Sequence, residues 1–251
     1  MIEKKEKQNN LAENKYKLHQ KYAMKNLLER QFAFIEKYIP FSSNILEVGC
    51  GVGDFLLYCR SREKKDIKGI DISEESVKIT NARLKKSGFH EAAQVQDIYK
   101  LADLVDMRNK FDVVIMRGVV HHLEDPKLAF DNIFKVLNSG GYLIILEGNI
   151  NSAYRNFILK IADCLRVKHE ASEFPHMSLK DTQKILKEVG FKKFVTKFLP
   201  GVFSPLAYLG FGGEYLWKMF NFLEEKIIYR LNPSFFSWWY FLLACKINSN
   251  G

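Results

Sequence analysis

The chain has 251 residues, of which 47% are apolar, so it is long enough to bury the core of one large domain. Its net charge is +9, and the excess of Lys and Arg lies in residues 1–30 and 151–251. Such a distribution is typical of a solvated surface, and it can also meet an anionic small molecule, an acidic lipid surface or nucleic acid.

The lysine-rich start has no apolar segment behind it, and the longest apolar stretch is shorter than the roughly 20 residues of a membrane-spanning helix. We therefore expect no signal peptide and no membrane anchor. The four cysteines form neither a CxxC pair nor a zinc-binding spacing. We expect reduced thiols and no metal in a soluble, cytoplasmic protein, for which peripheral contact with the inner membrane surface stays open.

In chain order, residues 13–39 predict one or two amphipathic helices that end before Pro40. From residue 41 to 150, short runs rich in Val and Ile alternate with helical patterns. The predicted strands are 44–48, 67–71, 92–96, 111–116 and 141–146, and two of the predicted helices are 74–88 and 126–141. Strands separated by helices indicate a parallel sheet with helices on both faces.

Residues 151–251 are expected to complete this sheet. Residues 178–190 predict a helix, with Ser178 and Asp181 forming a capping box and Gly190 at its end. Two further strands are predicted at 191–199 and 235–248.

An aromatic-rich insertion separates these last two strands at about residues 200–233. Residues 198–241 hold 15 of the 34 aromatic residues. A helix predicted at 213–231 carries an apolar stripe. The stripe consists of Leu216, Phe220, Leu223, Ile227 and Leu231. It could be core, the wall of an apolar acceptor pocket, or a face that meets a membrane.

The first strand runs directly into a glycine turn, ILEVGCGVGDF at residues 45–55. Glycines at 49, 51 and 53 are followed by Asp54, so the spacing departs from the GxGxxG of dinucleotide-binding turns. An acid at the helix start disfavours a pyrophosphate there. A ligand whose charged parts are a sulfonium and an amino acid is compatible with it.

Five segments in this order resemble the class I S-adenosylmethionine-dependent methyltransferases, in particular those that act on small molecules. They are EVGCGVGD (47–54), GIDIS (69–73), QVQDI (94–98), FDVVIMRGVVHHLEDP (111–126) and LNSGGYLIILEGN (137–149). The resemblance implies a Rossmann-like fold with a seven-stranded, mostly parallel sheet. It also implies S-adenosylmethionine as cofactor and S-adenosylhomocysteine as product.

The resemblance implies a cofactor-binding role for Glu47, Gly49, Gly51, Gly53, Asp71, Ile72, Asp97 and Ile98. We add Cys50, in the same turn, and Arg117 as further candidates. The glycines would let the backbone pass against the methionine part, with Glu47 organising the turn from beneath. Asp71 would accept both ribose hydroxyls and Asp97 the adenine amino group, with Ile72 and Ile98 on either side of the ring. Helix capping is the alternative role for both aspartates.

The fourth predicted strand ends in MRGVVHHL, without the [ND]PP[YF] segment typical of methylases of amide-like nitrogens. A hydroxyl acceptor needs a base, and a histidine suits that task at neutral pH. We expect His122 to be the base, with His121 aimed into the packing of the following helix. The alternative is that a histidine here packs near the cofactor and shapes the site without acting as base. His176 is a second candidate. Arg117 could touch the methionine carboxylate or an anionic acceptor.

The N-terminal helical segment would cover the cofactor. Tyr16, His19 and Tyr22 lie roughly on one face of it. The predicted organisation is a helical lid over residues 1–40, a cofactor-binding core over 41–150, and a C-terminal part over 151–251 that contains the helical insertion.

The predicted function is methyl transfer to a small-molecule acceptor, at oxygen, on an apolar, anionic, lipid-linked or sugar-linked compound. The alternatives are an RNA or protein methyltransferase, for which no dedicated nucleic-acid module is evident in the sequence, and a non-catalytic protein that binds the cofactor.

Overall fold

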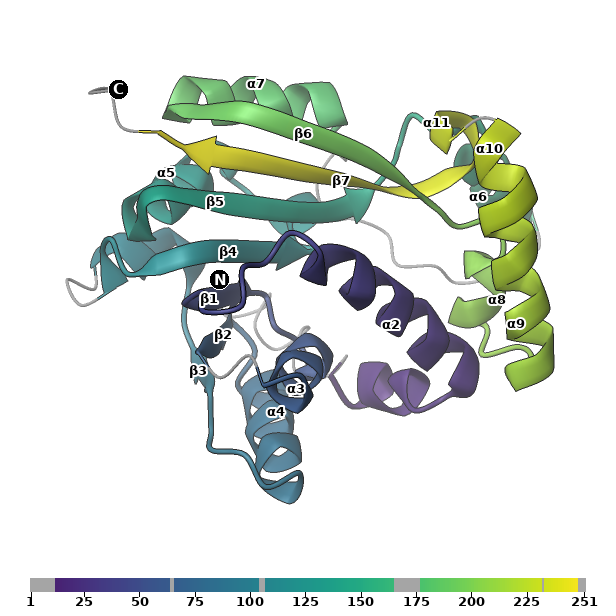
Figure 1. Cartoon of the computed structure of the whole chain (residues 1–251), viewed down its shortest axis with the longest axis horizontal. Coiled ribbons are helices and arrows are strands. Elements are labelled where there is room, and N and C mark those ends of the chain that lie inside the picture. The colour runs from purple at the N-terminus through teal and green to yellow at the C-terminus, as the bar shows by residue number, and fades with distance from the viewer. Residues whose placement is uncertain (1–11, 64–65, 104–106, 165–176, 232, 248–251) are drawn as a thin grey trace.

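The structure, a computed structural model, describes residues 12–63, 66–103, 107–164, 177–231 and 233–247. Its centre is a seven-stranded sheet with the strand order β3-β2-β1-β4-β5-β7-β6 (Figure 1). The strands are β1 (Ile45–Val48), β2 (Ile67–Asp71), β3 (Ala93–Val95), β4 (Phe111–Arg117), β5 (Leu137–Gly148), β6 (Phe191–Pro200) and β7 (Ser237–Lys246).

Strands β1 to β5 are parallel, and β7 runs antiparallel to both of its neighbours. The predicted seven-stranded, mostly parallel sheet is therefore confirmed. The carboxyl ends of the parallel strands meet at one edge of the sheet. In open α/β folds, ligands bind outside this edge.

Helices cover both faces of the sheet. Alternate residues of β4 show this division: Val113 and Ile115 face one apolar cluster, whereas Val114 and Met116 face the other. The first cluster includes side chains of α2 (Tyr22–Glu36), α3 (Asp54–Ser61) and α4 (Glu74–Lys86). The second includes side chains of α5 (Pro126–Val136), α7 (Leu179–Val189) and the 3₁₀ helix η1 (Ile98–Asp103).

The boundary between α5 and β5 differs from the prediction. The helix ends at Val136 and not at residue 141, because Leu137 already pairs with Phe111 of β4. The Asn138 side chain donates a hydrogen bond of 2.7 Å to Asp112 next to that pair. The last strand likewise begins at Ser237, since the two residues before it end the short helix α11 (Pro233–Phe236).

The C-terminal helices gather beyond the carboxyl ends of β4 and β5, at the right-hand end of Figure 1. They are α6 (Ala153–Cys164), α8 (Ser204–Tyr208), α9 (Glu214–Leu223), the π-helical turn η4 (Glu224–Ile228), α10 (Tyr229–Leu231) and α11. Both α8 and α9 contact α2, so the insertion and the N-terminal helix meet at the edge where ligands bind.

The predicted stripe of the 213–231 helix is wrong in its second half. Ile227 and Leu231 are 49% and 71% exposed, whereas Trp217 and Glu224 are buried. The π turn rotates the helix at this point. Glu224 accepts hydrogen bonds from the Arg30 guanidinium at 2.8 Å and from the Phe203 backbone N–H at 2.9 Å. A polar contact therefore sets which face of the helix is buried.

None of the helices in the described ranges combines the length and the apolar composition needed to cross a lipid bilayer.

Candidate active site

The turn after β1 depends on glycines with left-handed backbone conformations. Gly51 and Gly53 have φ angles of +53° and +80°, a region that other residues adopt at a cost. A Cβ atom on Gly53 would lie 2.5 Å from Thr80, whereas one on Gly51 would meet nothing within 4 Å. The turn is therefore packed from below at Gly53 and open at Gly51.

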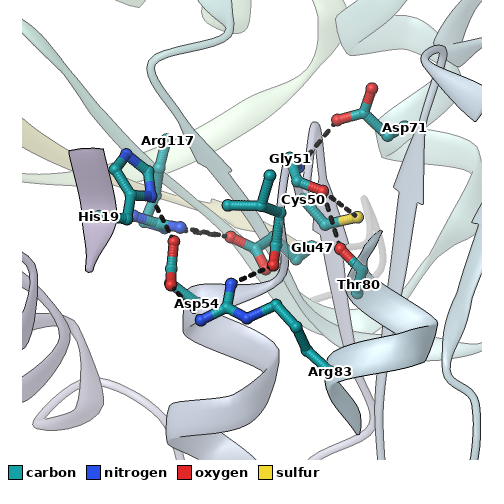
Figure 2. Close-up of polar contacts among 10 residues, drawn as sticks. His19, Glu47, Cys50, Gly51, Asp54, Asp71, Thr80, Arg83 and Arg117 are labelled. Carbon is teal, nitrogen blue, oxygen red and sulfur yellow. Dashed lines mark hydrogen bonds and ion pairs between the residues drawn. The ribbon is translucent and has the colours of Figure 1, made fainter. Parts of the chain in front are cut away.

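The Asp71 carboxylate ends β2 directly beside this opening (Figure 2). One oxygen accepts the Gly51 N–H at 2.8 Å and the other accepts the Ser73 N–H at 2.9 Å. Burial raises the pKa of Asp71, and the two backbone bonds partly oppose that rise. Since each oxygen has a second lone pair, the carboxylate can accept two further donors. The residue that caps α4 is Ser73, so capping is not the role of Asp71.

Glu47 lies fully buried beneath the turn and pairs with Arg117 at the end of β4. The Arg117 Nε and Nη2 atoms donate to Glu47 Oε1 at 3.1 and 2.8 Å, and the guanidinium also packs 4.6 Å from the Phe32 ring centroid. Burial raises the pKa of Glu47 to about 7 against the opposing effect of Arg117. The other oxygen, Oε2, is buried and has no hydrogen-bond partner among the described residues. The Arg117 guanidinium is thus bound to Glu47.

The helix that begins at Asp54 is tied to the N-terminal segment. Asp54 Oδ2 lies 2.5 Å from Nδ1 of His19, and its Oδ1 accepts a hydrogen bond of 2.8 Å from Arg83 (Figure 2). Burial alone would raise the pKa of Asp54, but the contacts with His19 and Arg83 outweigh it and lower that pKa to about 2. Tyr16 lies 5.1 Å from the Arg83 guanidinium. Tyr22 is 40% exposed and lies in the next helix, past a break at residues 20–21.

The remaining predicted cofactor residues lie directly after β1, β2 and β3. Asp97 accepts the Tyr99 N–H at 2.9 Å at the start of η1, so it does cap this short helix. Ile72 directly follows β2, and Ile98 directly precedes Tyr99. Both side chains are partly buried. Cys50 is buried in the glycine turn, and burial raises the pKa of its thiol.

Two histidines lie in the short 3₁₀ helix η3 (Val120–His122), which follows β4. His121 was expected to point into the next helix, but its Nδ1 lies 2.8 Å from Glu147 Oε1 at the end of β5. The rings of His121 and His122 are 4.0 Å apart. His176 lies outside the described residues.

Glu147 is the site residue that the sequence reading missed. It is buried, and besides His121 it accepts the backbone N–H groups of Val120 and Gly148, each at 2.9 Å. Burial would raise its pKa, but these hydrogen bonds and His121 together lower it, so the carboxylate is ionised. An acid that directly follows an apolar strand, as in LIILEG, was the available signal.

In the part of the chain that the structure describes, no group of three His, Cys, Asp or Glu side chains is placed to hold a metal ion. The polar groups at this edge instead form the carboxylate and histidine contacts described above.

A family model described as a methyltransferase domain matches residues 16–195, well over half of the chain. The chain belongs to this methyltransferase family. The methyltransferase also shares its fold with solved structures. One is an S-adenosylmethionine-dependent methyltransferase from Archaeoglobus fulgidus, with a TM-score of 0.62 and 18% identity over 92% of this chain and 99% of that one. The resemblance to class I S-adenosylmethionine-dependent methyltransferases, and the enzyme class and cofactor that it implies, are confirmed at the level of the family.

Another structural neighbour is phosphoethanolamine N-methyltransferase 2 of Haemonchus contortus in complex with S-adenosylmethionine. Its TM-score is 0.59 at 17% identity, and the match covers 88% of this chain and 53% of that one. Two curated relatives are the ubiquinone biosynthesis O-methyltransferase of Psychrobacter arcticus and the demethylmenaquinone methyltransferase of Bacteroides fragilis. The first is 27% identical over 59% of both chains, and the second is 31% identical over 43% of this chain and 44% of the other. The methyltransferase thus spans about three fifths or less of the length of these relatives.

The Asp54 contacts predict a pH-dependent contribution to stability. Because the folded-state pKa of about 2 lies below the ordinary value of 3.8, ionised Asp54 stabilises the methyltransferase above pH 4, and this stabilisation is lost as the pH falls toward 2. Asp54→Asn should lower the free energy of unfolding by about 2 kcal/mol at pH 7, and the difference should shrink below pH 4. Urea denaturation at several pH values measures it. Asp66→Asn, at an exposed position, is the control. A difference that does not change with pH would contradict the assignment.

Proposed function

We propose that this methyltransferase transfers the methyl group of S-adenosylmethionine to a hydroxyl of a small-molecule acceptor and releases S-adenosylhomocysteine. The observation that carries the proposal is the open glycine turn at Gly51 beside the partly buried Asp71 carboxylate, whose oxygens have lone pairs that can accept further donors. These two features lie where an open α/β sheet binds its ligands.

The hydrogen-bonding groups at this edge of the sheet fit S-adenosylmethionine. Asp71 would accept the ribose hydroxyls, and the backbone at Gly51 would lie against the methionine part. We assign Asp97 to the adenine amino group and Ile72 and Ile98 to the faces of the ring.

The cofactor supplies a methyl group on a sulfonium, which is already activated for transfer. The protein then has to orient the acceptor and remove its proton. His121 is well suited to this, because the ionised Glu147 holds its Nδ1 and leaves Nε2 as the atom that would accept the proton. This contact supports placing His121 ahead of His122 and His176 as the candidate base.

The two curated relatives support the choice of acceptor. One is named for O-methylation in ubiquinone biosynthesis and the other for methylation of demethylmenaquinone. We infer an acceptor with an apolar body. The aromatic insertion, which lies beyond the carboxyl ends of the strands (Figure 1), would contact that body.

A comparison of two glycines tests the cofactor site. Gly51→Ala and Gly88→Ala each place a Cβ at a positive φ and in open space, so each should cost about 1–2 kcal/mol of stability. Only the Gly51→Ala side chain would occupy the cofactor site. We expect calorimetry to show affinity for S-adenosylhomocysteine reduced tenfold or more in Gly51→Ala and unchanged in Gly88→Ala. Equal affinity of Gly51→Ala and the wild type would rule out this binding mode.

Substitution of the histidines tests the base. His121→Ala should lower turnover by about 10²–10⁴ with little change in affinity for S-adenosylhomocysteine, because a general base acts on the transition state. His122→Ala should have the smaller effect, and His90→Ala, at an exposed position, should have none. Transfer of labelled methyl from S-adenosylmethionine into compounds of a source-cell extract, followed by mass spectrometry, gives the rates. If affinity and turnover fall together in His121→Ala, His121 is a structural residue.

We further propose that an exposed apolar face of the insertion rests on an anionic membrane surface, from which an apolar acceptor would be drawn. Tyr215, Met219 and Phe222 follow one face of α9 and are 89%, 49% and 59% exposed. Leu209, Phe211 and Leu231, near the two ends of this helix region, are also more than half exposed. The net charge of +9 complements an anionic surface, and aromatic side chains favour the interface of a bilayer.

Co-sedimentation with phosphatidylglycerol vesicles tests this contact. The double variant Tyr215→Ser and Phe222→Ser should lose most of the binding and retain its affinity for S-adenosylhomocysteine. Phe41→Ser removes an equally exposed aromatic residue just before β1 and should bind as the wild type does. If the wild type stays in the supernatant at low ionic strength, the membrane contact is wrong.

A further inference from the structure

Arg155 lies next to the candidate active site, near the Glu147 carboxylate, and forms no ion pair with any of the described residues. It is the third residue of α6, and its guanidinium reaches back to the end of β5, where a Cβ on Gly148 would lie 3.4 Å from Nη2. The residue is largely buried. Its Nε atom is buried without a hydrogen-bond acceptor, and no ion pair of Arg155 is found within the described residues.

The backbone that carries Arg155 is fixed to β7. The Asn149 side chain donates to Ser237 Oγ at 2.6 Å, and the Asn149 backbone N–H donates to Trp238 O at 2.9 Å. Ser152 Oγ accepts the Arg155 N–H at 3.2 Å and itself donates to Phe235 O at 2.7 Å. The arginine is thus mounted on a rigid turn at the carboxyl edge of the sheet.

A largely buried guanidinium without an anion is unfavourable, because the protein does not replace the hydration that it loses. Burial accordingly lowers the pKa of Arg155, and the neighbouring Tyr208 and Glu147 oppose this shift only in part. The Trp238 ring, 5.9 Å from the guanidinium carbon, compensates only in part. The nearby Glu147 carboxylate already accepts hydrogen bonds from His121, Val120 and Gly148. None of the described residues therefore supplies an ion-pair partner for Arg155.

We propose that Arg155 binds an acidic group of the methyl acceptor, a carboxylate or a phosphate ester, through its planar guanidinium. Such groups match the paired N–H donors of arginine. The inference rests on the proposed function, since it places the acceptor at the carboxyl end of β5, where His121 and Glu147 lie. It adds a fixed anionic group to an acceptor whose other part is apolar.

NMR of the ¹⁵N-labelled protein saturated with S-adenosylhomocysteine tests the proposal, using benzoate, phenyl phosphate and neutral benzamide as probes. The Arg155 Nε–Hε resonance is identified by its absence in Arg155→Lys. We expect it to shift saturably with at least one anionic probe and not with benzamide. The anion that binds more tightly distinguishes a carboxylate from a phosphate ester. Arg155→Met should bind that anion at least tenfold more weakly, whereas Arg230→Met, at an exposed position, should bind as the wild type does.

The affinity of each variant for S-adenosylhomocysteine separates the proposed function from the proposed anion site at Arg155. Loss of cofactor binding by the wild type would reject the proposed function, and the anion titration would still report on Arg155. Intact cofactor binding with an Arg155 resonance that neither anion moves would overturn the anion site. Anion affinity unchanged in a folded Arg155→Met variant would overturn it equally.

Discussion

The hydrogen bond from the Gly51 N–H to the Asp71 carboxylate is the contact on which the candidate site depends. It joins the turn after β1 to the end of β2. The open backbone at Gly51 is thereby fixed beside the partly buried carboxylate of Asp71. Thr80 packs beneath Gly53 and donates a hydrogen bond of 2.8 Å to Gly51 O, which holds the same turn from the other side. The turn is therefore preformed, and ligand binding needs little additional ordering of the backbone.

The elements around this turn are connected to it by charged contacts between distant parts of the chain. His19 joins the N-terminal helix to Asp54, and Arg30 of α2 joins the same region to Glu224 of the insertion. Both acids are largely buried, so removal of either basic partner leaves a buried carboxylate with fewer compensating contacts. The cover over the carboxyl edge is consequently specified by a few ion pairs in addition to apolar packing.

The sequence predicted the sheet and its order of elements well, because alternating apolar runs and capping residues are local signals. The Ser178 capping box and the Gly190 helix end are present in the structure. It could not predict contacts that depend on tertiary pairing. Glu224, in the π turn, bonds to Arg30, 194 positions away, and the orientation of His121 follows from its contact with Glu147 on β5. Asp71 and the glycines were proposed from their order along the chain, whereas the lack of an ion-pair partner for Arg155 among the described residues becomes visible only when its surroundings are known.

A crystal structure of the complex with S-adenosylhomocysteine tests the central claim most directly. The account predicts that both ribose hydroxyls donate to Asp71 while its hydrogen bonds from the Gly51 and Ser73 N–H groups are retained, with the homocysteine part against Gly51. A ligand bound elsewhere, or a ribose that does not touch Asp71, would contradict it.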